Sequence, residues 1–325
     1  MTREGNWARL SFPIEAHGFG AVLQVVDEPD SSVIQSIAKM KILTAKPLAS
    51  YSKDRAILVQ RMVEVKPTKP QNSPSPDMVH IPGGDFFFVV GGIEIEGSND
   101  QGIDVQYPWE DSPRRLHEHF MHVDAFDMDK YPVTNKQFKV FLDATHYHPK
   151  DELNFLKDWQ GGTYPPGWED KPVTWVSLED ARAYAAWAGK RLPHEWEWQY
   201  VAQGLDQRKY PWGNLWRPDA VPVPDQGRTM HGPDEVYAHP AGVSTYGVMD
   251  MVGNVWQWTD EYVDEHTRSA ILRGGCYYQP QGSMWYFPQA YQSNQHGKLL
   301  LMAPSFDRAG TVGFRCVSDS PKTRP

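Results

Sequence analysis

Two cysteines, Cys276 and Cys316, are the side chains of this 325-residue chain best suited to redox or covalent chemistry. A thiolate can act as a nucleophile or bind a soft metal ion such as copper(I), and two thiols can form a disulfide. Two cysteines are too few for a disulfide scaffold or for a zinc site built on paired C-x-x-C motifs. We expect two unpaired thiols, with a single bridge as the alternative.

Histidines gather in residues 116–122, LHEHFMH, and His146 and His148 follow further along. Side chains two residues apart on a strand share a face, so His117 and His119 could together bind iron or zinc. The alternative is an ordinary strand with histidines in the core or at the surface. We favour this alternative, because histidines in such positions are commoner than metal ligands.

A third candidate is the segment after the sequence LRGG at residues 272–275, which is rich in aromatic and amide side chains. Aromatic faces flanked by amides suit the stacking of sugars or peptides, with polar contacts at the edges. The alternative is an aromatic core that takes the place of missing helices, and we assign Trp256 and Trp258 to the core. The side chains that we assign to ligand binding are Arg273, Tyr277, Tyr278, Gln279, Trp285 and Tyr286.

Helix-start signals in the middle of the chain predict the elements that carry these candidates. Thr134 and Gln137 form a capping box before a helix with one aromatic face. Ser177 starts a second helix that ends before Gly189, and a third short helix ends near Gly204. The chain beyond that point reads as short strands and long loops, which need pinning by aromatic clusters or metal ions.

The composition divides the chain at residues 67–77, PTKPQNSPSPD, whose Pro, Ser and polar residues are typical of an extended linker. Residues 1–66 form a small β segment in this interpretation, with strand-like apolar runs in 33–43 and 56–65. The stretch SFPIEAHGFGAVLQV resembles the closing strands of the β-sandwich appended to some glycoside hydrolases. Residues 78–320 form the second domain, in line with a prior of ~150 residues per domain.

Seven motifs in the second domain follow one another in an order that resembles a known family. They read MVHIPGGD (78–85), DMDKYPVTNKQFKVFL (127–142), PVTWVSLEDARAYAAWAGKRLPHEWEW (172–198), YPWGN (210–214), YGVMDMVGNVWQW (246–258), LRGG (272–275) and GFRC (313–316). The family is that of the formylglycine-generating, sulfatase-modifying enzymes, with ergothioneine-synthase C-terminal domains and non-catalytic secreted proteins among its relatives. The resemblance implies an α+β fold: an irregular C-type-lectin-like domain, here preceded by a small β-sandwich segment.

The family enzymes, as the resemblance implies, bind copper through two cysteines shortly after the RGG strand and use dioxygen to oxidise a substrate cysteine to formylglycine. In this chain the matching positions carry Gln279 and, approximately, Met284, and neither is a thiol. Cys276 lies three residues before the first position and is the one candidate catalytic residue. A thiol and a thioether could still hold copper(I), but coordination by two thiolates would be lost. The alternative is that Cys276 is a small buried residue. We therefore do not expect copper.

Iron is not expected either. The ergothioneine branch of the family holds its iron with histidines of a separate helical domain. Nothing in residues 1–77 resembles such a domain. That chemistry is therefore not carried over to this chain.

The resemblance also implies a calcium site in residues 250–257. The side chains of Asp250 and Gln257 and the carbonyl oxygens of Gly253 and Val255 stand at the ligand positions. The family has Asn at the first ligand position and Glu at the last. In this chain the carboxylate of Asp250 stands first and the amide of Gln257 stands last. Calcium accepts roughly six to eight oxygens from carboxylates, amides and carbonyls, so the exchange is chemically conservative. The alternative is that Asp250 caps a turn without metal.

The charge balance restricts the possible partners. The chain has 41 acidic and 32 basic residues, a net charge of -9, and no long run of either sign. Phosphate binding needs clustered Lys and Arg, and no apolar stretch approaches the roughly 20 residues that span a bilayer. We expect neither a nucleic-acid partner nor a membrane span. The chain shows no signal peptide, and the family resemblance favours an extracellular or periplasmic location.

The function that we expect is that of a non-catalytic, calcium-stabilised binding domain. It would recognise carbohydrate or a protein partner through the aromatic surface after LRGG. One alternative is a divergent metal- and oxygen-dependent oxidoreductase of the same superfamily. Another is a structural subunit of an extracellular assembly, in which the domain packs against copies of itself.

Overall fold

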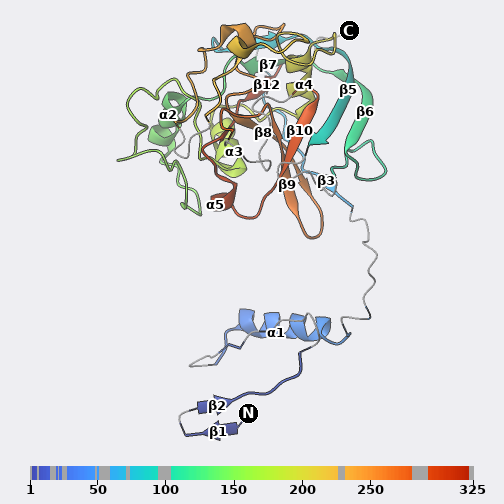
Figure 1. The fold of residues 1–325 in the computed structure, drawn as a ribbon, viewed down its shortest axis with the longest axis vertical. Coiled ribbons are helices and arrows are strands. Elements are labelled where there is room, and N and C mark those ends of the chain that lie inside the picture. Colours follow the sequence, from blue (N-terminus) through green and yellow to red (C-terminus); the bar gives the residue numbers. More distant parts are fainter. Residues whose placement is uncertain are drawn as a thin grey trace. The chain divides into compact units, whose positions relative to one another are not determined.

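The computed structural model describes residues 2–5, 7–14, 20, 22–23, 28–47, 50, 59–70, 74–93, 104–225, 231–279 and 292–321 (Figure 1). The chain divides into two compact units, Met1–Ile57 and Leu58–Pro325. The candidate residues all belong to the second unit.

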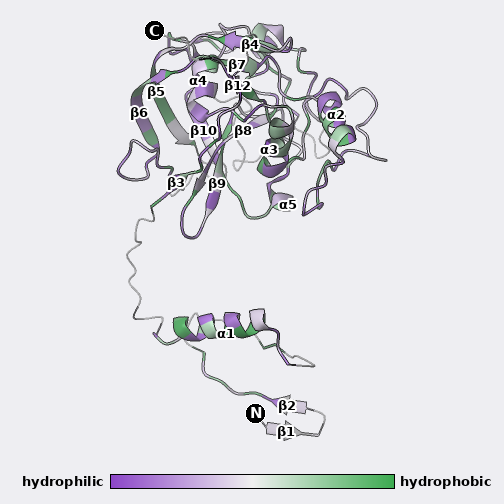
Figure 2. Ribbon diagram, turned by 180° about the vertical axis from the view of Figure 1, so that it is seen from behind, coloured by the Kyte–Doolittle hydropathy of each residue, from purple (hydrophilic) through white to green (hydrophobic). Residues whose placement is uncertain are grey.

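The first unit contains a hairpin and a helix. β1 (Thr2–Glu4) pairs antiparallel with β2 (Trp7–Arg9), and α1 comprises Ser31–Leu43. The strand-like interpretation of residues 33–43 is therefore wrong. The Asp30 side chain accepts hydrogen bonds from the amides of Ser32 and Val33 in the first turn, and this cap is a stronger local signal than the apolar run. No residue of α1 is buried, and Figure 2 shows hydrophobic and hydrophilic stretches along it.

The second unit is built around a sheet that has seven strands in the described part of the chain. Its order is β11-β8-β9-β10-β5-β6, with β3 paired to β8. The strands are β3 (Arg61–Met62), β5 (Gly84–Ile93), β6 (Leu116–Val123), β8 (Trp256–Val263), β9 (Arg268–Arg273), β10 (Gln295–Leu300) and β11 (Val312–Gly313). β10 runs parallel to β5, and β11 runs parallel to β8, whereas the other pairs are antiparallel.

A smaller sheet of three strands joins the beginning and the end of this unit. β7 (Phe126–Asp129) lies between β4 (Met78–Ile81) and β12 (Val317–Asp319), and it is antiparallel to both. The opening motif of the second domain and the end of the GFRC motif are thereby held against the same central strand.

Helices α2 (Asn135–Thr145) and α3 (Leu178–Trp187) begin where the sequence predicts, and α4 (Glu195–Gln203) ends at the predicted Gly204. The capping boxes of Thr134 with Gln137 and of Ser177 with Asp180 are both formed. The described residues of this unit also contain a short α5 (Pro304–Asp307) and the 3-10 turns η2 (Pro218–Ala220) and η3 (Pro240–Gly242). Among the described residues, no helix has the length and apolarity to cross a membrane.

The core of the second unit consists of two clusters of buried side chains. One joins β5 to α4 and includes Phe88, Trp198 and Tyr200. The other joins α2 and α3 to β8 and includes Trp258 and Phe314, together with both cysteines. Trp256 and Trp258 are buried, which confirms their assignment to the core. Each fully buried large apolar side chain contributes roughly 1.5–3 kcal/mol.

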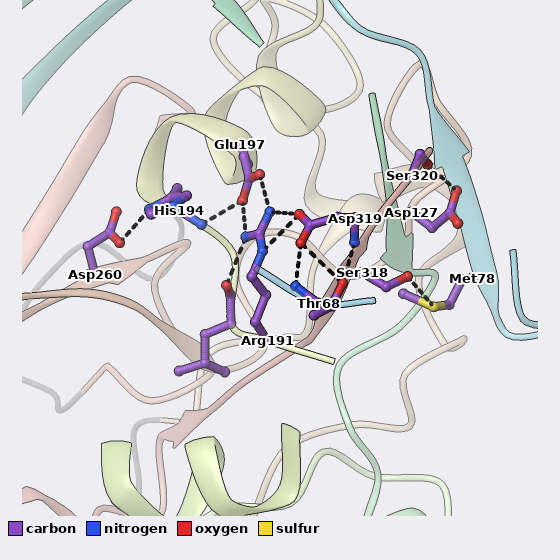
Figure 3. A network of polar contacts seen from close by, with 11 residues as sticks. Thr68, Met78, Asp127, Arg191, His194, Glu197, Asp260, Ser318, Asp319 and Ser320 are labelled. Carbon is purple, nitrogen blue, oxygen red and sulfur yellow. Dashed lines mark hydrogen bonds and ion pairs between the residues drawn. The ribbon is translucent and has the colours of Figure 1, made fainter. Parts of the chain in front are cut away.

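Thr68, at the start of the predicted linker, belongs to the second unit and contacts Asp319 in its last strand (Figure 3). The amide of Thr68 donates to Asp319 Oδ2 at 2.5 Å, and the Asp319 amide donates to the Thr68 hydroxyl at 2.7 Å. Arg191 bridges Asp319, at 2.6 Å, and Glu197, at 2.7 Å. The division at residues 67–77 stays a prediction. The structure adds that Thr68 is tied to the last strand of the smaller sheet.

Candidate functional site

The turn after β9 brings the copper-position segment against the calcium-position segment. Gly274 has φ +96, and a Cβ at this residue would collide with the carbonyl oxygen of Met251. Only glycine fits here, because a side chain would meet both backbone strain and that oxygen. Gly253 donates its amide to Gly274 O at 3.0 Å, and Tyr277 donates to Asn254 O at 2.9 Å. Backbone hydrogen bonds therefore hold the segment at the copper position against the loop at the calcium position.

Cys276, the candidate catalytic residue, is buried beside this turn. Its thiol donates to Tyr278 O at 3.5 Å, and burial raises its pKa to about 12. The thiol is therefore protonated at neutral pH, whereas the nucleophile and metal ligand is the thiolate. Cys316 is fully buried as well, and burial raises its pKa well above the ordinary value. The expectation of two unpaired thiols is confirmed.

Arg273 and Tyr277, both assigned to ligand binding, direct their polar groups into the core. Both are buried, and the Tyr277 hydroxyl donates to Gly310 O at 3.2 Å. The Arg273 guanidinium donates to Glu195 at 3.0 Å and to Gln199 at 2.9 Å. Both side chains thus hold the segment that follows to the core through buried hydrogen bonds. Their assignment to ligand binding stays a prediction.

Tyr278 and Gln279 lie at the edge of the described structure and are partly exposed. The Gln279 amide donates to Asp225 O at 2.9 Å, and the Asp225 amide donates to Tyr277 O at 2.8 Å. The first turn of the aromatic segment is thus fixed to the loop that contains Asp225. Met284, Trp285 and Tyr286 lie outside the described residues.

The histidines of β6 lie on both faces of the strand pair. His117 is fully buried, and its Nδ1 lies 2.8 Å from Glu110. Burial lowers the pKa of His117, against the effect of Glu110. His119 stacks on Trp109, and His122 contacts Asp85 at the surface. Among the described residues, no three His, Cys, Asp or Glu side chains are grouped to hold a metal ion.

A buried polar cluster around Glu195 escaped the sequence analysis. Its carboxylate accepts hydrogen bonds from Tyr107, at 2.6 Å, and from Arg273, and it also contacts His296 Nδ1. Burial acts to raise the pKa of Glu195, but His296 and Arg273 outweigh it and hold that pKa at about 2. The cluster ties α4 to β9 and β10. The partners are about a hundred residues apart, and no spacing in the sequence signals their contact.

Asp250, the first predicted calcium ligand, is buried at the start of its loop with φ +56. Its Oδ2 accepts a hydrogen bond of 2.9 Å from the Asn254 side chain. Asn254 is itself held by reciprocal 3.0 Å hydrogen bonds with the backbone of Asp234. Burial raises the pKa of Asp250 to about 7. The structure thus brings Asp250 next to Asn254, a side chain that the sequence analysis did not select.

Gln257, the last predicted ligand, is fully buried, and its amide makes four hydrogen bonds. Oε1 accepts from Trp198 Nε1 at 2.9 Å and from Arg315 Nε at 2.7 Å. Nε2 donates to the carbonyl oxygens of Asp250, at 3.0 Å, and Met251, at 3.1 Å. Because a carboxamide has two acceptor and two donor positions, no lone pair remains for a cation. The Gln257 side chain does not fit the position of a calcium ligand.

A cleft of about 380 Å³ opens near the start of α2. Its lining includes Asp77, Asp129 and Asp170 together with Tyr131 and Tyr237. The Asp129 carboxylate is engaged by Lys190 at 2.5 Å, whereas Tyr237 is 53% exposed. This cleft could not be predicted from the sequence, because its lining residues come from four separate stretches of the chain.

Comparisons of the sequence with known proteins find a matching family and similar relatives. The family described as "Sulfatase-modifying factor enzyme 1-like domain" matches residues 63–320. The chain is 30% identical over 294 residues to "Inactive C-alpha-formylglycine-generating enzyme 2" of Bos taurus, with 76% of this chain and 89% of the relative covered. It is also 30% identical over 320 residues to the formylglycine-generating enzyme of Mycobacterium tuberculosis, with 75% and 98% covered.

A solved structure supports the fold. PvdO from Pseudomonas aeruginosa is 21% identical and gives a TM-score of 0.52, covering 79% of this chain and all of that one. The predicted α+β fold and the predicted resemblance are both confirmed. Family membership does not decide the activity, because one relative is named inactive and another is named for the enzyme. The chain belongs to the family of sulfatase-modifying factor enzyme 1-like proteins.

Proposed function

We propose that this protein is a binding member of the family that does not oxidise a substrate cysteine with copper. The observation that carries the proposal is Gln279, which stands where the resemblance places the first copper cysteine. Copper(I) selects soft ligands, and a carboxamide is a poor substitute for a thiolate. Cys276 does not supply the missing ligand, because its thiol is buried, protonated and directed at Tyr278 O.

The ligand that we propose is a carbohydrate, bound by the aromatic segment that begins at Tyr278 and Gln279. Aromatic faces with amides at their edges match the apolar faces and hydroxyl rims of sugars. The hydrogen bonds to the Asp225 backbone support the proposal, because they give the segment a fixed base. A protein partner at the same surface is the other outcome of the binding test below.

The copper part of the proposal is tested with a peptide that contains the sulfatase cysteine motif. We expect the native protein, incubated with copper and oxygen, to leave the peptide unmodified in mass spectrometry. The double variant Gln279→Cys with Met284→Cys is the matched control, and we expect it to gain stoichiometric copper(I). Formylglycine made by the native protein would refute the proposal. Oxygen consumption by protein that contains iron or copper would instead support the oxidoreductase alternative.

The ligand part is tested on a glycan array. We expect Tyr278→Ala and Trp285→Ala each to weaken binding by about tenfold, roughly 1.4 kcal/mol of stacking energy. Tyr237→Ala, in the cleft beside α2, is the control and should leave binding unchanged. The reverse pattern would move the site to the cleft. Binding of no glycan, together with capture of a protein that is lost in Tyr278→Ala, would favour a protein partner.

A second candidate function is assembly through copies of this chain, and the outer face of β6 favours it. β6 lies at an edge of the larger sheet, and no described strand pairs with its other side. Leu116 and Phe120 on this face are 59% and 66% exposed. An unpaired edge strand that carries exposed apolar side chains favours pairing with another strand. If two β6 strands paired antiparallel about Phe120, Glu118 of one copy would lie opposite His122 of the other.

A further inference from the structure

The loop of residues 250–257 is where the family resemblance implies a calcium ion. Its contacts in this chain point to a different way of closing the loop. We infer that the side chains of Gln257 and Arg315 take the place of the cation, so that this protein folds and stays stable without calcium. The inference does not depend on the proposed function.

The orientation of the Gln257 amide is fixed by its four partners. Both donors that face Oε1, Trp198 Nε1 and Arg315 Nε, carry hydrogen that cannot be accepted by an NH₂ group. Both partners that face Nε2 are carbonyl oxygens, which cannot donate. A flipped amide would lose all four hydrogen bonds and place like charges together. The amide therefore directs its N–H groups, not its oxygen, at the loop.

Those N–H groups do part of what a cation does. A bound calcium ion draws several loop carbonyls toward one point. Here the two N–H groups of Gln257 draw the carbonyls of Asp250 and Met251 toward one nitrogen, at 3.0 and 3.1 Å. A glutamate in this position has no donors and would leave these carbonyls beside a carboxylate oxygen, an arrangement that a divalent cation between them would stabilise.

Arg315 supplies the positive charge. It is fully buried, and it donates to the carbonyl oxygens of Met249, at 2.8 Å, Asp250, at 2.9 Å, and Asp129, at 3.0 Å. The guanidinium remains charged at any physiological pH. Because Arg315 Nε donates to Gln257 Oε1, a divalent cation at that oxygen would meet a repulsion that the neutral amide of Gln257 does not offset. Arg315 and Gln257 together hold carbonyls at the start of the loop, those of Met249, Asp250 and Met251. The resemblance places the cation on the carbonyls of Gly253 and Val255, so this chain closes the loop through a different set of oxygens.

The native protein decides the question in a thermal-unfolding experiment. An ion present at a hundredfold excess over its Kd would raise the melting temperature of a domain of this size by about 5–10 °C. We expect the melting temperatures in calcium and in EDTA to agree within about 1 °C, and dialysed protein to contain no stoichiometric calcium by elemental analysis. A calcium-dependent rise of 5 °C or more, or one bound calcium per chain, would overturn the inference.

The variant Gln257→Glu tests whether a carboxylate at this position makes the loop depend on calcium. It removes two buried donors and adds a carboxylate oxygen beside two carbonyls. We expect its melting temperature in EDTA to fall by roughly 5 °C or more and to recover when calcium is added. Gln203→Glu is the matched control, because Gln203 is also buried and accepts from Gln199 at 2.8 Å. Its melting temperature should fall without recovery in calcium. If Gln257→Glu recovers no better than the control, the inference is wrong.

Discussion

At the scale of the single residue, Glu195 predicts how the free energy of unfolding depends on pH. Its pKa is held at about 2, below the usual 4.5, by His296 and Arg273 against the effect of burial. A depressed pKa stabilises the fold above pH 4.5, and this contribution is lost as the pH falls from about 4.5 toward 2. The contribution of Glu195 to the free energy of unfolding that is lost in this window amounts to about 3 kcal/mol. We expect the free energy of unfolding, measured by urea titration, to fall over this window.

The variant Glu195→Gln tests this assignment. It should be less stable than the native protein at pH 6 but should lose less of its stability between pH 4.5 and pH 2. Glu179→Gln, on the exposed face of α3, should reproduce the native profile. An unchanged pH profile in Glu195→Gln would show that other carboxylates cause the acid sensitivity.

Residues whose identity alone is informative could be predicted from the sequence. Gln279 and Cys276 can be placed against the family motifs one residue at a time. The contacts of Gln257 could not be predicted, because Arg315 lies 58 residues away and Trp198 lies 59 residues away. Amide and guanidinium side chains can pair with many groups, and only the folded backbone selects their partners.

At the scale of the element, the turn between β9 and Cys276 depends on one glycine. We expect Gly274→Ala to destabilise the protein by more than about 2 kcal/mol, because it adds a collision with Met251 O to the strain at φ +96. Gly189→Ala is the control. Its φ is +69 with open space around it, so its cost should be limited to roughly 1 kcal/mol of strain. Equal losses in urea unfolding would contradict the collision.

The helices show which local signals are reliable. α2 and α3 could be predicted because a capping box fixes the first turn and the apolar spacing fixes the buried face. α1 was missed because its Asp30 cap precedes a run of apolar residues that resembles a strand and is exposed throughout. A cap is a local hydrogen bond and persists without tertiary contacts, whereas apolar spacing has meaning only against a core.

At the scale of the whole molecule, the family motifs predicted the fold class but not the order of the strands. β10 lies between β9 and β5, and it is parallel to a strand about two hundred residues earlier. Pairings across such a separation leave no periodic trace in the sequence. The edge position of β6 follows from this order and could not have been predicted either.

The exposed edge leads to a prediction about assembly. We expect the native protein to associate as its concentration rises in light-scattering experiments, and we expect Phe120→Lys to remain a monomer, because a charge replaces the apolar centre of the edge. Phe306→Lys, at an exposed position in α5, should behave like the native protein. A native monomer at all concentrations would exclude this candidate function.

The position of β12 also affects how this protein is made. Strands from early and late in the second unit meet in the small sheet, where Val317–Asp319 pair with β7. A ribosome releases the chain from its N-terminus, so β4 and β7 emerge long before their third strand exists. The small sheet must remain incomplete until residues 317–319 have been translated, and its open strand edges must be shielded until then. A premature stop just before Val317 would therefore yield a protein that cannot finish folding.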